Sequence, residues 1–273
     1  MTVCIAENIN IMSKTSGVAI KEKNPAPVQK MAAALTENGA DYLDLNIGPA
    51  RKGGDGIMEW LVNTVRKVTD LPLSLDTTIS LQPERLEKGL PMVTKYKADV
   101  IGLLWGKDGM PRDANERAAM AVDFIYQANE AGIHASSIWI DPIITPICVD
   151  VNQVTAALEF MSMLSEIAPE AKSIVGLSNV SNGAPNNLRH YLNRTFMIML
   201  MKHGIYSAIM DGFDAELFKI IRGDRPEYVK LVHSIMDGDE PDPDRLEQAE
   251  LEYYKTTRVL MGKILYSDSW LTT

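Results

Sequence analysis

The feature that most constrains the fold is an alternation of short apolar runs with helix-forming segments along most of the chain. The apolar runs are typical of buried strands, and proline, glycine and asparagine signals bound the helices between them. The expected strands cover residues 3–9, 41–48, 71–78, 100–106, 138–146, 174–180 and 207–212. Strands that alternate with helices in this way predict a parallel α/β fold with helical crossovers.

Polar residues stand in or just beyond nearly every expected strand. They are Asn10, Asn46, Asp76, Asp141, Asn179 and Asp211. In a closed βα barrel the carboxyl ends of all strands meet at one mouth, whereas an open doubly wound sheet usually carries a glycine fingerprint after its first strand. This chain has no such fingerprint, so we expect a TIM (βα)8-type barrel that forms a single domain over residues 1–273. Seven strands are found where the barrel has eight, which indicates that one βα unit is missing.

Composition narrows the possible partners and compartment. The 273 residues carry a formal net charge of -9, and an acidic surface repels nucleic-acid phosphate. Two cysteines, Cys4 and Cys148, lie in apolar runs and are expected to be buried thiols of a reducing compartment. Neither a signal peptide nor an apolar run of membrane-spanning length is found. We therefore expect a cytoplasmic protein without nucleic-acid or membrane partners.

The pattern changes near the C-terminus, where helices are expected at residues 227–236 and 244–265. These helices form a predicted C-terminal arm over about residues 224–273. An apolar face is expected from Leu246, Leu251, Tyr254, Val259 and Leu260. Such a face can pack on the barrel or on another subunit, and a homodimer is predicted.

The stretch from Ile174 to Thr195 is the strongest candidate for a binding site. An apolar strand turns abruptly into the amide-rich sequence SNVSNG at residues 178–183, and the following helix carries Arg194. Amides and a guanidinium can recognise a flat, nitrogen-rich ligand without a metal, although an ordinary loop with asparagine caps has the same composition. Asp76 and Asp141 lie in otherwise apolar strands, where a carboxylate is costly without a partner. They are therefore interpreted as ligand-binding rather than structural.

Several common kinds of chemistry leave no pattern in the chain. The four histidines and two cysteines show no metal-ligand spacing, so no metal site is predicted. There is no serine nucleophile elbow and no phosphate-binding GxxxxGK[ST] loop. The methionine-rich run at residues 197–203 is interpreted as core.

Taken together, the motifs resemble those of the methyltetrahydrofolate:corrinoid methyltransferases, in the pterin-binding superfamily that includes dihydropteroate synthase. The resemblance runs in order along nearly the whole chain. Its pieces are ENIN at 7–10, NPAPV at 24–28, YLDLNIGPA at 42–50, MEWLV at 58–62, LSLDTT at 73–78, VIGL at 100–103, WIDPIITP at 139–146, VGLSNVS at 175–181, LNRTF at 192–196 and YSDSW at 266–270.

The resemblance implies a methyl transfer between N5 of tetrahydrofolate and the cobalt of a corrinoid carried by a partner protein. It implies that Asp76 and Asp141 hydrogen-bond the pyrimidine side of the pterin, and that Gly176 and Ser178 line the pocket. Asn179 would lie near N5 as a catalytic residue, with Asp141 strengthening the same network. Arg194 would cover the ligand, and Asn10 and Asn46 complete the expected binding set. The corrinoid itself can attack the methyl group, which fits the absence of a protein nucleophile.

The chain departs from this family after the DTT sequence at residues 76–78. Members of the family have a further βα unit there, whose strand ends in an Asn-Ser motif that helps to hold the pterin. Here roughly twenty residues are absent, either as a true deletion or as a segment omitted from the sequence. Two alternatives follow: a catalytically silent pterin-binding protein, and a dihydropteroate synthase-like enzyme. The latter usually needs basic residues at its last strand, and residues 207–212 contain none.

Overall fold

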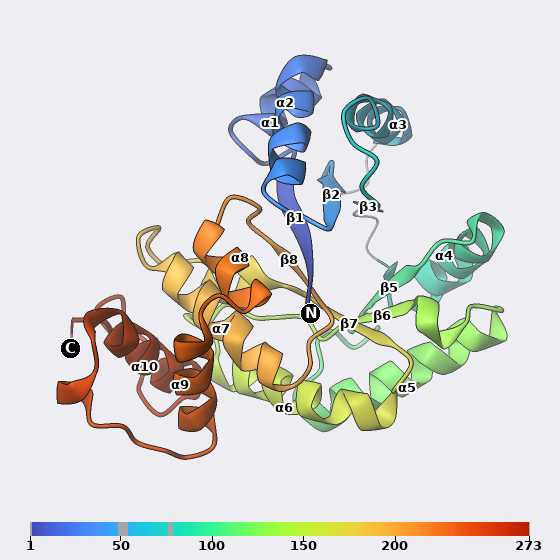
Figure 1. The fold of residues 1–273 in the computed structure, drawn as a ribbon. Helices are drawn as coiled ribbons and strands as arrows, with labels where there is room; N and C mark the ends of the chain where they lie inside the picture. The colour runs from blue at the N-terminus through green and yellow to red at the C-terminus, as the bar shows by residue number, and fades with distance from the viewer. Residues whose placement is uncertain (1, 49–53, 76–78, 273) are drawn as a thin grey trace. The chain divides into compact units, whose positions relative to one another are not determined.

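The computed structural model describes residues 2–48, 54–75 and 79–272, with strands and helices that alternate as the sequence predicts (Figure 1). The chain divides into two compact units. One contains residues 3–77 and 207–218, and the other contains residues 1–2, 78–206 and 219–273. Each unit is built on its own set of parallel strands.

The first unit contains a parallel sheet in the order β3-β2-β1-β8. Its strands are β1 (Val3–Asn10), β2 (Tyr42–Asn46), β3 (Leu73–Leu75) and β8 (Ser207–Met210), and its helices include α1 (Ser16–Lys21), α2 (Pro25–Glu37) and α3 (Gly54–Val65). The start of α2 follows from its sequence, because the Asn24 side chain accepts a hydrogen bond from the Ala26 N–H and Pro25 occupies the first turn. The core of this unit joins Ile9 and Leu43 of the sheet to Ile20 and Leu35 of the helices.

The second unit contains a parallel sheet in the order β7-β6-β5-β4. Its strands are β4 (Ile79–Ser80), β5 (Val100–Leu103), β6 (Ile138–Asp141) and β7 (Lys172–Gly176). Its helices include α4 (Pro83–Tyr96), α5 (Ala114–Glu130), α6 (Val151–Ile167) and α7 (Arg189–Lys202), with the 3-10 turns η1 (Ala135–Ser137) and η2 (Leu177–Ser181). Helices α5 and α6 lie together beside β5, β6 and β7 (Figure 1). The run at 197–203 supplies core residues as predicted, since Met197 and Met199 are buried.

The C-terminal arm is helical, as expected. It contains α9 (Pro226–Met236), the 3-10 turn η3 (Pro243–Arg245) and α10 (Gln248–Leu260). Helix α10 packs against α7 and α9 of the same chain, and Tyr254, Val259 and Leu260 are buried there. Much of the apolar face predicted for the arm is therefore covered within one subunit.

The departure after residues 76–78 is visible in the sheet pairing. The predicted strand 71–78 is observed in part as β3, at residues 73–75, and the two-residue strand β4 lies beyond its predicted end, at residues 79–80. In the described residues, β3 pairs with β2 in the first unit and β4 pairs with β5 in the second. The seven strands expected from the sequence did not include β4. The fold class is confirmed: a parallel α/β fold of the TIM-barrel type with one βα unit missing.

Two short helices were not predicted: α1 and α8 (Ala215–Arg222). Each has only six or eight residues. Helices this short owe their stability to packing rather than to intrinsic propensity, so their sequence signal is weak.

Candidate functional site

Asp141 is the last residue of β6, where it is half-buried. The sequence predicted a strand running on to residue 146, but Pro142 has no N–H to continue the ladder and the strand stops. The Asp141 carboxylate accepts a hydrogen bond from the Ile143 N–H at 2.8 Å. Ile143 has a φ of 61°, a strained conformation for a β-branched residue. The turn that holds Asp141 at the strand end therefore has a strained backbone, which persists only where contacts with neighbouring residues stabilise it.

The environment of Asp141 favours its neutral form. Burial raises the pKa of this carboxyl from 3.8 to about 6, and the hydrogen bond from Ile143 opposes the rise. A carboxyl with this pKa can hold or release a proton near neutral pH. Perturbed acids of this kind are concentrated at functional sites, which supports the interpretation of Asp141 as a site residue.

The neighbouring strand β7 ends at Gly176 and leads into η2, which carries Ser178 and Asn179. Asn179 is exposed, and its amide nitrogen lies 2.9 Å from the position that a Cβ of residue 176 would occupy. The absence of a side chain at Gly176 is therefore what leaves room for the Asn179 amide. The Asn179 oxygen accepts a long hydrogen bond of 3.4 Å from the Asn182 amide. The structure thus presents an accessible amide directly after a buried strand, as the sequence predicted.

Arg189, in the first turn of α7, braces this loop. Its guanidinium donates to the Ser181 hydroxyl at 3.1 Å, to the Asn182 side-chain oxygen at 3.1 Å and to the Ser178 carbonyl at 3.5 Å. The sequence interpretation overlooked this residue and selected Arg194, the guanidinium inside the family motif. The only sequence signal for Arg189 was its place just after the amide-rich loop.

Arg194 lies further along α7, close enough to Tyr191 to influence its titration. Burial raises the pKa of the Tyr191 hydroxyl, Glu252 of α10 adds to the rise, and the charge of Arg194 lowers it. Arg194 is thus electrostatically coupled to residues where α7 and α10 pack together. Its role over a ligand stays a prediction.

The loops that follow β6 and β7 are tied to each other. The Ile147 N–H donates to the Val180 carbonyl at 2.9 Å, and the Cys148 thiol lies 3.1 Å from the Asn182 carbonyl. The prediction that Cys148 is buried was wrong, because this loop faces solvent, whereas Cys4 is buried as expected. Since β6 and β7 also pair in parallel, Asp141 and the Asn179 loop belong to one connected edge of the second unit.

Two predicted residues of the first unit, Asn10 and Asn46, are brought together by register, because they are paired across β1 and β2. Their side-chain oxygens accept hydrogen bonds from the N–H groups of Met12 and Gly48, each at 2.8 Å. Each asparagine therefore caps its own turn, and a further contact with a ligand stays a prediction for both.

A second polar pair in this unit contains Asp211, which was noted as a polar strand end, and Asn8, which was not selected from the sequence. The Asn8 amide donates to the Asp211 carboxylate at 2.8 Å, which joins the ends of β1 and β8. The signal that could have found Asn8 is the two-residue period of a strand, which places it on the same face as Asn10.

Asp76 lies outside the described residues, as does the junction between Thr78 and Ile79, where a strained connection was predicted. In the described ranges, no three His, Cys, Asp or Glu side chains are grouped so that they could share a metal ion. No helix of the described chain has the length and apolar character needed to cross a membrane.

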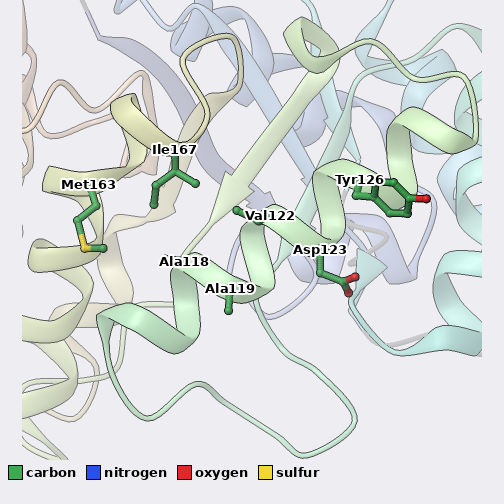
Figure 2. A pocket seen from close by; sticks show the side chains of 7 residues that line it. All are labelled: Ala118, Ala119, Val122, Asp123, Tyr126, Met163 and Ile167. Carbon is green, nitrogen blue, oxygen red and sulfur yellow. The ribbon is translucent and has the colours of Figure 1, made fainter.

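An apolar hollow lies on the outer surfaces of α5 and α6 (Figure 2). It is lined by Ala118, Ala119, Val122, Asp123, Tyr126, Met163 and Ile167. None of these residues belongs to the predicted site, and the lining offers a single carboxylate as its charged group. The hollow is therefore separate from the polar edge formed by Asp141 and the Asn179 loop.

Comparison with solved structures identifies the fold. Dihydropteroate synthase from Yersinia pestis matches with a TM-score of 0.63 at 15% sequence identity, over 83% of this chain and 94% of that one. The enzyme from Xanthomonas albilineans matches with a TM-score of 0.61 at 15% identity, over 83% and 92% of the two chains. At this identity the likeness shows the fold alone, which is the fold of these dihydropteroate synthases.

Sequence comparison is more specific. A curated relative from Eubacterium limosum, named methylcorrinoid:tetrahydrofolate methyltransferase, is 25% identical over 80% of this chain and 88% of its own length. Methionine synthase from Mycobacterium tuberculosis is 26% identical over 66% of this chain, which spans only 18% of that protein. No protein-family profile matches the chain. The predicted resemblance to folate:corrinoid methyltransferases is therefore confirmed as a sequence similarity to the Eubacterium limosum enzyme.

Proposed function

We propose that this protein is a methyltransferase that moves a methyl group between N5 of tetrahydrofolate and the cobalt of a corrinoid protein. The observation that carries the proposal is the match, over most of both chains, to a relative named for a methylcorrinoid and tetrahydrofolate. The paired strands β6 and β7, which end in Asp141 and Gly176, support it, because they present an acid and an amide at one edge.

The proposed chemistry asks little of the protein beyond placing groups around the folate. A tertiary amine leaves poorly until its nitrogen gains positive character, and Asn179 can donate to or accept from N5 in either state. Its amide is accessible and is placed by the missing side chain of Gly176. Asp141, whose pKa is raised to about 6, can exchange a proton with an ordered water near neutral pH. The corrinoid supplies the nucleophile.

The remaining predicted contacts are retained as parts of the proposal. Asp76 and Asp141 would bind the pyrimidine edge, whereas Gly176 and Ser178 would line the pterin. Arg194 would cover the bound folate, and Asn10 and Asn46 would contribute amides from the first unit. The proposed partners are a corrinoid protein and a second copy of the chain in a homodimer, in the cytoplasm.

Two measurements test the function. Isothermal titration with methyltetrahydrofolate asks whether the chain binds the folate without the missing βα unit. Single-turnover transfer to Co(I) cobalamin, followed by the change in the corrinoid spectrum, then asks whether bound folate reacts. Binding with transfer supports the proposal. Binding without transfer would identify a silent pterin-binding protein, and absence of binding would refute the folate assignment.

Dihydropteroate synthase activity is the second candidate, and the structural matches bear only on its fold. That reaction releases a diphosphate, which needs positive charge near the last strand. Strand β8 has the sequence SAIM, and Asp211 directly after it is hydrogen-bonded to Asn8. The charge here is negative, so the methyltransferase is preferred.

A further inference from the structure

Arg117, on α5, is a fully buried charged residue outside the predicted site. Its exposed fraction is 0%. The guanidinium donates from Nε to the Pro142 carbonyl at 3.0 Å, from one terminal nitrogen to the Asp113 carbonyl at 3.2 Å, and from the other to the Gln153 side-chain oxygen at 2.7 Å. Every acceptor is a neutral oxygen, and in the described chain no carboxylate forms an ion pair with it.

Burying a charged guanidinium in the core without a carboxylate partner is energetically unfavourable. Burial lowers the pKa of Arg117, because the charged form is desolvated, and the charge of Asp113 only partly opposes this. An apolar side chain of similar volume would avoid this desolvation, and replacing buried ionic groups in this way is often neutral or stabilising. A contribution to stability therefore explains the buried guanidinium less well than the hydrogen bonds by which it fixes neighbouring groups.

What Arg117 holds is the turn that presents Asp141. The Pro142 carbonyl and the Ile143 N–H belong to the same peptide group. Arg117 binds the carbonyl side of this group at 3.0 Å, and the Asp141 carboxylate binds its N–H side at 2.8 Å. The Pro142–Ile143 peptide is thus hydrogen-bonded on both sides, next to the strained φ of 61° at Ile143.

A further hydrogen bond fixes the position of the Arg117 guanidinium. Gln153, at the start of α6, accepts from Arg117, and its amide nitrogen donates to the Arg112 carbonyl at 3.0 Å. The guanidinium is therefore oriented by Gln153 of α6, which is itself hydrogen-bonded to the segment just before α5. A cation on a peptide carbonyl also polarises that peptide, which makes its N–H a stronger donor to the carboxylate.

We propose that Arg117 is a positioning residue that orients Asp141, and supports its charged form, through the Pro142–Ile143 peptide. The proposal deepens the proposed function in that it concerns the acid of the same site. Removing the guanidinium would free the peptide to rotate out of its strained conformation. Asp141 would then lose both its orientation and its hydrogen-bond donor.

The test is a titration of Asp141 by NMR of protein labelled at aspartate carboxyl carbons, with the resonance assigned by its absence in Asp141→Asn. In the described chain, burial raises the pKa of Asp141 and the hydrogen bond from the Ile143 N–H lowers it. We therefore expect Arg117→Met to raise the midpoint by about one pH unit, because a donor to the charged form is weakened. Arg117→Lys keeps a charge but cannot satisfy three acceptors with the same planar geometry, so a smaller rise is expected.

Arg258→Met is the matched control, because that guanidinium contacts Tyr254 and Glu240 on the C-terminal arm. It should leave the Asp141 midpoint unchanged. A parental midpoint in folded Arg117→Met, or an equal shift in the control, would overturn the proposal. If Arg117→Met does not fold, Arg117→Lys decides: a raised midpoint supports the proposal, and a parental one overturns it.

A parallel titration with methyltetrahydrofolate separates this inference from the proposed function. We expect Arg117→Met to weaken folate binding about tenfold, since a misplaced contact loses most of one hydrogen bond. If the parent protein fails to bind folate, the proposed function is refuted, yet the NMR midpoints still decide whether Arg117 positions Asp141.

Discussion

Replacing Asp141 with asparagine gives a direct test of the electrostatics at the end of β6. The asparagine oxygen can still accept from the Ile143 N–H, so the turn is preserved and only the titrating group is removed. The folded protein raises the pKa of Asp141 from 3.8 to about 6. Between these values the folded chain retains a proton that the unfolded chain releases. Stability from this group is therefore fully present below pH 3.8 and is lost as pH rises through about 6.

The magnitude follows from the two pKa values. At about 1.36 kcal/mol per pKa unit, ionising Asp141 costs the folded state at most about 3 kcal/mol. Because the side chain is only half-buried, solvent reduces this figure, and about 1–3 kcal/mol is expected. The neutral asparagine avoids the cost, so Asp141→Asn should be more stable than the parent at pH 8 by this amount. The difference should shrink toward zero at pH 4.

Urea unfolding of both proteins between pH 4 and pH 8 measures this difference. Asp99→Asn serves as a control of opposite sign. Burial favours the neutral form of Asp99, but hydrogen bonds from Trp139 and Lys172 outweigh it and lower the pKa. Its loss should destabilise the protein by a nearly constant amount between pH 4 and pH 8, because a carboxyl with a lowered pKa loses its stabilising contribution only as pH falls below the unfolded value of 3.8. A pH-independent difference for Asp141→Asn, or a less stable variant at pH 8, would refute the assignment of a raised pKa.

Three further substitutions test the site and the core. Asn179→Ala should slow methyl transfer at saturating folate by about 10- to 1000-fold with a smaller effect on affinity, because the lost hydrogen bond strengthens in the transition state; a parental single-turnover rate would leave Asn179 as a pocket residue only. Gly176→Ala places a Cβ 2.9 Å from the Asn179 amide. It should therefore slow transfer by about 10- to 100-fold while leaving the melting temperature nearly unchanged, and a normal rate would show that the amide position is unimportant. Gly102→Ala would bring a Cβ within 2.1 Å of the buried Phe124 ring. It should destabilise the protein by about 1–3 kcal/mol, and calorimetry giving an unchanged melting temperature would contradict this packing.

Local sequence signals were sufficient for most of the fold. The proline and glycine signals that bound the expected helices are seen at α2, which begins at Pro25 and ends before Gly39, and the structure adds the Asn24 cap. The missing βα unit was also predicted from the sequence. Fewer strands were counted than the barrel has, and the segment after residues 76–78 is shorter than the corresponding segment of the family. The short strand β4 was not predicted, because two residues carry no periodic signal and their pairing with β5 is a long-range property.

The candidate site was only partly readable. Asp141 and Asn179 were selected because a polar residue in or directly after an apolar strand is unfavourable to bury without a hydrogen-bonding partner. This argument does not depend on the rest of the structure. The exposure of Cys148 could not be read in this way, since its apolar neighbours Ile147 and Val149 differ in burial themselves: one is buried and the other is exposed. A hydrophobic run without clear periodicity does not say which side faces solvent.

By itself, the sequence determined the order of strands and helices and the chemical character of their ends, because both depend on residues that are near one another in the chain. The tertiary structure alone decided what those ends experience. Arg117 lies in a buried stripe of α5 with Ala114, Ala121 and Phe124, a pattern that could have marked it as unusual. Its partner, however, is a carbonyl 25 positions away. The pKa of Asp141 likewise depends on burial by distant segments, and desolvation and hydrogen bonding act through space rather than along the chain.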